Sequence, residues 1–202
     1  MQKKEIDEEL GEMGQGYLSE SAYRLWRRRI PWLLVLMVSA TVSGAILTRF
    51  EAVLPSILLV FVPMLMDTGG NCGAQASVAV IRAISVGEAG LAKLPQVLRK
   101  ECAVGLFSGV TLGVAAFIKV LLVDRVIMNN TALTVSVAAC IAASVALVAF
   151  ASKIIGALLP MIAKRLGLDP AVMSSPLITT LVDAVALLIY FFISFFFLAP
   201  II

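Results

Sequence analysis

Five apolar segments constrain this chain more than any other feature of its sequence. A helix needs about 20 mostly apolar residues to cross a bilayer. The segments that qualify are about Pro31 to Leu47, Pro55 to Ile81, Cys102 to Val123, Ala132 to Ile162 and Pro176 to Ala199. Only 14% of the 202 residues are charged and 60% are hydrophobic, whereas soluble domains are about 25% charged. The sequence therefore predicts an all-α integral membrane protein with five transmembrane helices.

The N-terminal segment, residues 1–29, differs from the rest of the chain. It is rich in charges of both signs and has no long apolar stretch. One helical stripe is formed by the apolar residues Ile6, Leu10, Met13 and Tyr17. This spacing predicts a short amphipathic helix before the first span, with a partly ordered tail as the alternative. We therefore divide the chain into a cytoplasmic or interfacial segment, residues 1–29, and a transmembrane domain, residues 30–202.

Basic residues are unevenly distributed between the two sides that five spans define. With the N-terminus inside, the inside segments carry twelve Lys and Arg residues and the outside segments carry two, Arg49 and Arg125. Cytoplasmic segments of membrane proteins carry the excess of Lys and Arg. We therefore expect a multi-pass protein of the cell's inner (plasma) membrane, with the N-terminus in the cytoplasm and the C-terminus outside. Lys119 and Lys153 lie within spans, where we expect them to reach toward an interface rather than pair with an acid.

Several function classes are excluded by residues that the chain lacks. It has no histidine, which removes Ser-His-Asp triads, Cys-His dyads and histidine-liganded metal sites. Its three cysteines are far apart in apolar segments and form no CxxC pair, as expected of buried free thiols. The basic residues follow the membrane boundaries instead of forming one patch, so the expected partner is membrane lipid and not nucleic acid.

Two carboxylates remain within the spans, Asp67 in the second and Asp183 in the fifth. Ionisable residues inside a bilayer are costly, which by default suggests a function. Thr179 precedes Asp183 by four positions and therefore shares its helical face. A buried, protonated acid bonded to another helix is the alternative for both aspartates.

The second span carries a polar, glycine-rich stretch. Asp67, Asn71 and Gln75 recur at every fourth position, and Gly70 with its neighbours lets the backbone approach an ion or another helix. All the ligands on offer are oxygen atoms, the set that Mg²⁺ and Ca²⁺ prefer. No motif is duplicated, so an ion path would most simply lie between two identical chains. Four carboxylates in such a dimer would require either a bound cation or protons.

Glycines at every fourth position also have a structural explanation, because this spacing lets membrane helices pack closely. It occurs at Gly69 and Gly73 in the second span, and at Gly105, Gly109 and Gly113 in the third. We interpret the glycines of the third span as packing residues. We interpret Gly69, Gly70 and Asn71 as functional, because these glycines occur together with polar side chains.

Two longer stretches resemble the MgtE family of magnesium transporters. They are PMLMDTGGNCGAQASVAVIR, residues 63–82, and LLPMIAKRLGLDPAVMSSPLITTLVDAVALLIY, residues 158–190. The entry to the first span, RRRIPWLLVLM, is also similar to that family. The resemblance covers about residues 24–195, with five spans in the same order.

The resemblance implies transport of Mg²⁺ by a homodimer, along an axial ion path lined by the second and fifth helices. It implies that Asp183 binds hydrated Mg²⁺ and that Thr179 contributes a backbone carbonyl one turn earlier. Backbone oxygens of the glycine-rich stretch, at Gly70 and Asp67, would also face the ion. With the amide of Asn71, these five residues are the candidate metal ligands.

The chain departs from the family pattern at Asp67, where members typically have glycine. An added carboxylate would hold a cation more tightly, which suits a carrier better than a fast channel. The family also resembles animal solute carriers that are proposed to exchange Na⁺ for Mg²⁺. A Na⁺-coupled Mg²⁺ exchanger or exporter is therefore the alternative function, and transport of another divalent metal is a further one.

Full-length members of the family carry a long cytoplasmic region and a pair of CBS domains that sense Mg²⁺. Residues 1–29 contain neither, so we expect a natural short form, with a piece cut from a longer protein as the alternative. A separate partner could then supply the regulation. An enzyme is not expected. The residues around the two aspartates do not match an intramembrane aspartyl protease, and one aspartate per span is too few for a lipid phosphotransferase.

Overall fold

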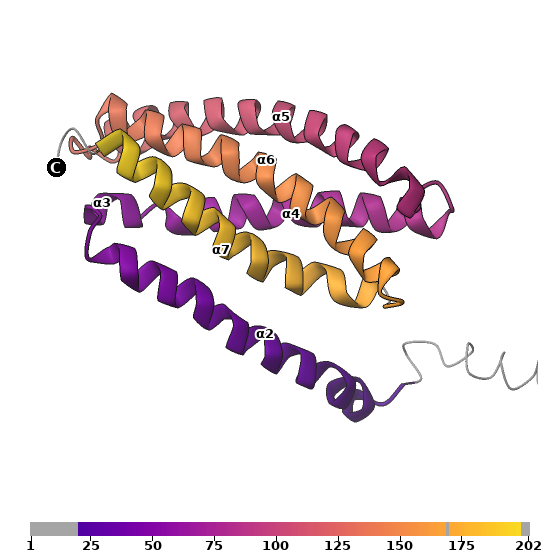
Figure 1. The fold of residues 1–202 in the computed structure, drawn as a ribbon. Coiled ribbons are helices and arrows are strands. Elements are labelled where there is room, and N and C mark those ends of the chain that lie inside the picture. The colour runs from indigo at the N-terminus through magenta and orange to yellow at the C-terminus, as the bar shows by residue number, and fades with distance from the viewer. Residues whose placement is uncertain (1–19, 169, 199–202) are drawn as a thin grey trace, which may run out of the picture. The chain divides into compact units, whose positions relative to one another are not determined.

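The computed structural model describes residues 20–168 and 170–198, and its regular structure is helical (Figure 1). The longer helices are α2 (Ala22–Glu51), α4 (Val62–Ser85), α5 (Leu94–Lys119), α6 (Val135–Arg165) and α7 (Pro170–Leu198). The shorter elements are α3 (Ser56–Leu59), the 3₁₀ turn η1 (Leu91–Lys93) and the π-helical segment η2 (Val120–Ile127), which continues α5. The amphipathic helix expected around Ile6 to Tyr17 lies outside the described residues.

The five predicted spans are confirmed as helices long and apolar enough to cross a membrane. Each extends beyond its predicted bounds at one end or both. The first helix begins well before the predicted apolar segment, because α2 starts at Ala22 and contains Pro31 in its interior. The preceding residues include alanine, leucine and arginine, which are good helix formers, so the helix starts before the proline.

The second span is divided into α3 and α4 at Val60 and Phe61. Pro63 occupies the first turn of α4. Proline has no backbone N–H, and its ring clashes with the carbonyl one turn earlier, which favours a break at this point, although α2 and α6 continue through Pro31 and Pro160. The glycine-rich stretch does not break α4, which runs through it without interruption.

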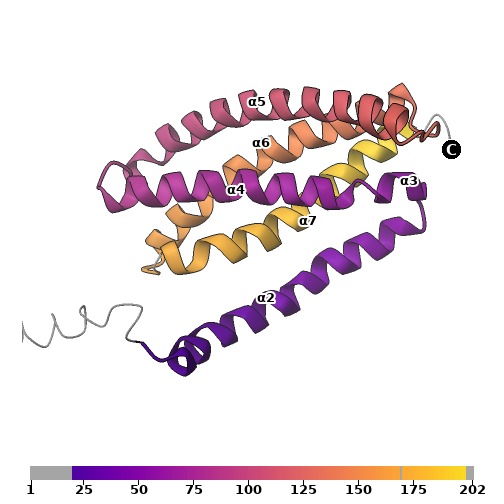
Figure 2. The same cartoon turned by 180° about the vertical axis from the view of Figure 1, so that it is seen from behind.

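Contacts divide the chain into two compact units, residues 1–39 and 40–202. The described part of the first unit includes the beginning of α2, from Ala22 to Ser39. In the second unit, α6 packs against α4, α5 and α7, and α4 also packs against α7. Figures 1 and 2 show α6 between α5 and α7 from opposite sides. Helix α6 is therefore the centre of this unit.

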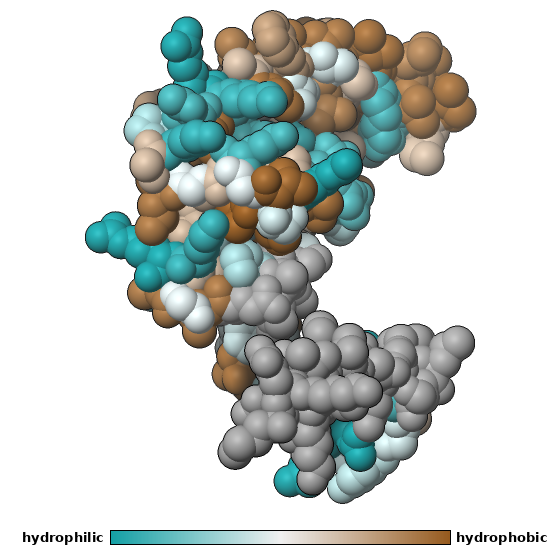
Figure 3. All heavy atoms as spheres, turned by 90° about the vertical axis from the view of Figure 1, so that its right-hand side faces the viewer, coloured by the Kyte–Doolittle hydropathy of each residue, from teal (hydrophilic) through white to brown (hydrophobic). Residues whose placement is uncertain are grey.

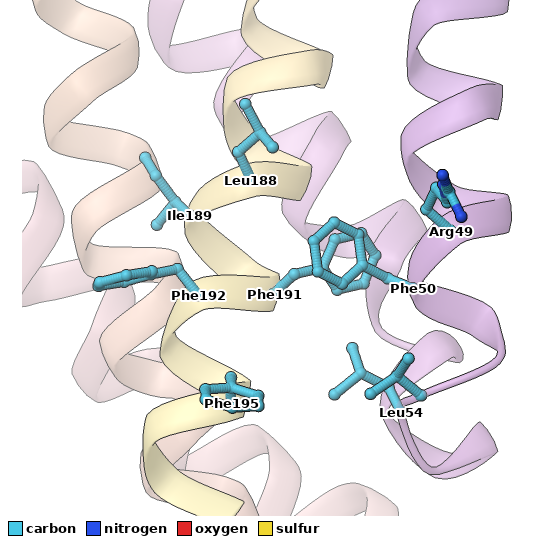
Figure 4. Close-up of a pocket in the computed structure, with 9 residues that line it drawn as sticks. Arg49, Phe50, Leu54, Leu188, Ile189, Phe191, Phe192 and Phe195 are labelled. Atoms are coloured by element: carbon cyan, nitrogen blue, oxygen red, sulfur yellow. The ribbon is translucent and has the colours of Figure 1, made fainter. Parts of the chain in front are cut away.

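The core of the second unit lies where α3, α4, α6 and α7 meet, around Leu58, Leu65, Ile141 and Tyr190. The buried Tyr190 hydroxyl donates a hydrogen bond of 2.8 Å to the carbonyl of Leu58, which fixes α3 against α7. At the end of α2, the ring of Phe50 stacks on Phe191 of α7 at 4.3 Å between centroids (Figure 4). The second half of α2 is therefore anchored to α7.

The glycines of α5 are packing residues, as predicted. A Cβ on Gly109 would lie 2.6 Å from the carbonyl oxygen of Ala146 in α6, and one on Gly113 would lie 3.0 Å from that of Ala142. Only glycine permits α5 and α6 to approach this closely.

The expectation for the two lysines within spans is wrong in that Lys119 pairs with an acid and Lys153 is buried among the helices. Lys119 forms an ion pair with Asp124, at 2.8 Å between Nζ and Oδ2. The wider π-helical turn of η2 brings these two side chains onto the same side. Lys153 in α6 is 5% exposed, and its ammonium donates to Oε1 of Gln75 in α4 at 3.0 Å.

Charged side chains gather at one end of the second unit, where α4 turns into α5 and α6 turns into α7. The basic residues there are Arg82, Lys93, Arg99, Lys100, Lys164 and Arg165. Figure 3 shows hydrophilic side chains collected on this face. The folded chain thus places together the residues that predicted the cytoplasmic side, and the orientation itself stays a prediction.

Candidate cation site

Asp183 lies near the middle of α7, about halfway between the helix ends at Pro170 and Leu198. Its side chain is half-buried and lines a cavity of about 240 Å³ between α2, α4 and α7. The residues around the cavity are Ala40, Ser43, Gly44, Leu47, Met66, Thr180, Asp183 and Leu187. A carboxylate and two hydroxyls are therefore the polar side chains of a largely apolar cavity.

Gly70 and Thr179 are brought together, as the candidate site requires. A Cβ on Gly70 would lie 3.6 Å from Cγ2 of Thr179, so α4 and α7 are within van der Waals distance there. Gly69 packs more tightly, since its Cβ would lie 2.8 Å from side-chain atoms of both Val148 and Val182. Gly69 is thus explained by helix packing.

Asp67 and Asn71 face a different part of the molecule. Both side chains are exposed, and Nδ2 of Asn71 donates to Oδ2 of Asp67 at 3.1 Å. They line a groove of about 530 Å³ between α4 and α5, together with Gln75, Ser108 and Thr111. Within one chain, Asp67 and Asp183 therefore line separate hollows.

The buried ammonium of Lys153 lies next to one end of this groove. Gln75, which accepts its hydrogen bond, is one helical turn beyond Asn71. The polar stripe of α4 thus carries the carboxylate of Asp67 and, two turns along, the amide of Gln75, which is hydrogen-bonded to the ammonium of Lys153. A cation in the groove would be attracted at one end and repelled at the other.

Neither hollow offers a closed cage of charged ligands. Among the described residues, no three His, Cys, Asp or Glu side chains gather closely enough to hold a metal ion. A single carboxylate with hydroxyl and carbonyl oxygens suits a hard cation that keeps most of its water, as Mg²⁺ does. Six waters occupy about 180 Å³ at about 30 Å³ each, so the Asp183 cavity can accept a hydrated ion.

The other polar residues of these hollows were not among the candidate ligands predicted from the sequence. Ser43 and Gly44 interrupt the apolar first span, and Thr180 adjoins Thr179, so a search for polar residues within spans would have found them. Ser108 and Thr111 also lie within an apolar span, but the predicted span, Cys102 to Val123, contains no carboxylate. Only the packing of α4 and α5 on the same helix, α6, brings them beside Asp67.

Comparison with known proteins gives one family and three relatives. The profile of MgtE, described as a divalent cation transporter, matches residues 62–193. The chain is 38% identical to magnesium transporter MgtE of Thermus thermophilus over 176 residues, in an alignment that covers 86% of this chain and 37% of that protein. The proteins of the same name from Bacillus subtilis and Enterococcus faecalis are 34% and 30% identical, over 84% and 90% of this chain. The chain spans well under half the length of these relatives.

Proposed function

This chain belongs to the MgtE family of divalent cation transporters, and from that premise we propose that it carries Mg²⁺ across the plasma membrane. It is a multi-pass membrane protein of a transporter family and not an enzyme. Mg²⁺ is the proposed ion because the three relatives that this chain resembles are named magnesium transporters.

The Asp183 cavity is the observation that carries this proposal. A carboxylate in the middle of a membrane-spanning helix is costly unless it serves an ion or a proton. Asp183 opens into a space large enough for a hydrated ion, next to hydroxyl groups. The contact between Gly70 and Thr179 lies one helical turn from Met66 and Asp183 of this cavity, and neither residue lines it. We assign Asp183 as the carboxylate that attracts the hydrated cation, with oxygens from Thr179 and Gly70 alongside.

A homodimer accounts for the exposed polar stripe on α4. Asp67 and Asn71 are exposed in a helix that spans the membrane, where lipid cannot solvate polar groups. A second copy facing this stripe would enclose it in a watery path along the dimer axis. Such a path would also let Asp67 and Asn71 of each chain contribute to ion binding.

The dimer predicts a specific crosslink. Val78 lies on the same stripe of α4 and is 67% exposed. In a variant without the three native cysteines, Val78→Cys is expected to give a covalent dimer in membranes treated with a short bis-maleimide. Val114→Cys, on an exposed part of α5 (56%), is the matched control and should stay monomeric on denaturing gels. A dimer from Val114→Cys alone would place the interface elsewhere.

The proposed function is tested by Mg²⁺ flux into proteoliposomes that contain the purified wild-type chain. A Mg²⁺ gradient should drive uptake above that of protein-free liposomes, and the uptake should saturate with Mg²⁺ concentration. No uptake above the protein-free level, with and without a Na⁺ gradient, would reject Mg²⁺ transport by this chain.

Na⁺-coupled exchange is a second candidate, and the groove at Asp67 favours it. The groove offers one carboxylate with amide and hydroxyl oxygens, a set suited to a monovalent hard cation. It is separate from the Asp183 cavity within one chain, so Na⁺ and Mg²⁺ would occupy different sites.

Exchange predicts that Asp67→Asn removes the effect of Na⁺ and leaves Mg²⁺ binding in place. An outward Mg²⁺ flux stimulated by an opposing Na⁺ gradient should fall at least fivefold in this variant, to the level without Na⁺. Glu88→Gln, which changes an exposed carboxylate in the turn after α4, should behave like wild type. If wild-type flux does not respond to Na⁺, the protein is not an exchanger.

A further inference from the structure

We infer that α2 forms the third wall of the ion cavity, and that the Ser43 hydroxyl binds the water shell of the transported cation while Gly44 keeps the cavity open. This inference rests on the proposed function and extends the site to a helix outside the candidate ligand set. The ligand class is a hydrated divalent cation.

The anchoring of α2 places Ser43 and Gly44 beside Asp183. Phe50 of α2 stacks on Phe191 of α7 at 4.3 Å, and Figure 4 shows the two rings face to face between the helices. About two turns before this contact on both helices, Ser43 and Gly44 line the same cavity as Asp183. The stack thus holds the C-terminal part of α2 against α7.

Ser43 has a hydroxyl group that needs a partner. Its side chain is 9% exposed, and its buried Oγ accepts or donates no hydrogen bond among the described residues. Other hydroxyls of α2 satisfy themselves within the helix: Thr48 Oγ1 donates to the carbonyl of Gly44 at 3.0 Å, and Ser39 Oγ donates to that of Leu36 at 2.8 Å. A buried hydroxyl without a partner costs free energy, so the cavity is where Ser43 must find one.

Gly44 provides the space. A Cβ added to Gly44 would meet no atom within 4 Å, although glycine lowers helix stability relative to other residues. Packing therefore does not explain this glycine, unlike Gly69 or Gly109. An open wall next to Asp183 is what a hydrated ion requires, since water must remain on its far side.

Hydrated Mg²⁺ gives Ser43 a suitable partner. Water bound to a divalent cation is polarised and donates strong hydrogen bonds. The Ser43 oxygen can accept one from a water on the side of the ion that faces away from Asp183. Contact through water is consistent with the reluctance of Mg²⁺ to lose its shell.

The test compares four variants with wild type in proteoliposomes, using Mg²⁺ as the probe. Ser43→Ala should raise the Mg²⁺ concentration for half-maximal flux about fivefold, because the loss of one ordinary hydrogen bond weakens binding by about this factor. Ser43→Thr keeps the hydroxyl and should stay within about twofold of wild type. Gly44→Leu adds an apolar side chain at the cavity wall and should reduce flux more than tenfold. Val42→Leu, on an exposed part of α2 (56%), is the matched control and should be unchanged.

A direct measurement separates this inference from the proposed function. Calorimetric titration of the purified protein with Mg²⁺ reads binding without flux, and should show the same weakening for Ser43→Ala. If Asp183→Asn loses Mg²⁺ binding while Ser43→Ala and Gly44→Leu bind and transport as wild type does, the role of α2 is wrong and the proposed function stands. If Gly44→Leu does not elute as a folded protein, the result for Ser43→Ala against Ser43→Thr decides.

Discussion

Replacing Asp183 by asparagine is expected to abolish Mg²⁺ flux while leaving the fold intact. Asparagine has almost the same shape, so the change removes little but the charge. With one water layer between them, a carboxylate and a divalent ion lie about 5 Å apart and attract by roughly 6 kcal/mol at an effective dielectric constant of about 20. Losing half of this attraction would weaken binding by more than about 100-fold. Flux at millimolar Mg²⁺ should therefore fall to the protein-free level.

The matched control is Asp124→Asn, which removes a different buried carboxylate from a membrane helix. Asp124 is 8% exposed and pairs with Lys119, and it lies in neither hollow. Its replacement should lower thermal stability but leave the Mg²⁺ concentration for half-maximal flux unchanged. Wild-type flux in Asp183→Asn, or an equal loss in both variants, would contradict the assignment of Asp183.

The fold was largely predictable from the sequence because the bilayer imposes simple length and charge limits. Long apolar runs with few charges can only be membrane helices, so the number of spans follows from the sequence. The ends of the helices are less predictable from the sequence, because polar residues can continue a helix beyond its apolar run. Residues 22–30 do so in α2 and residues 94–101 do so in α5. The break before α4 depends on Pro63, which the apolar pattern does not distinguish.

The candidate site was only partly predictable, because spacing along one helix does not determine which face another helix covers. The sequence pattern identified Asp183 and Asp67, and the structure places Gly70 and Thr179 close together. It does not bring Asp67 into the Asp183 cavity, since α4 turns its glycines toward α6 and α7 and its polar stripe away. The pairing of Lys153 with Gln75 joins residues 78 positions apart, which no local pattern contains.

Replacing Gly156 by alanine is expected to prevent normal packing of α4 on α6. A Cβ on Gly156 would clash with the carbonyl oxygen of Gly73 and lie 2.8 Å from its carbon. Both partners are helical backbone, which cannot rotate aside as a side chain can, so the helices must separate. Overpacking of a well-packed interior costs about 1–3 kcal/mol, and a backbone clash belongs at the upper end. At roughly 2–4 °C per kcal/mol for a chain of this size, the midpoint of thermal unfolding should fall by roughly 6–12 °C.

Gly105→Ala and Gly44→Ala are the comparison variants, and the thermal unfolding midpoints of all three variants are measured in the same detergent. A Cβ on Gly105 would lie 3.2 Å from Cδ2 of Phe150, a ring that can shift by a few tenths of an ångström, so its loss of stability should be smaller. Gly44 has no atom within 4 Å of the added carbon, and alanine there should raise stability through its higher helix propensity. Equal midpoints for all three variants would show that α4 and α6 are not in backbone contact. The contact matters for ion binding as well, because Gly73 lies one turn beyond Gly70 and its packing sets where α4 meets Thr179.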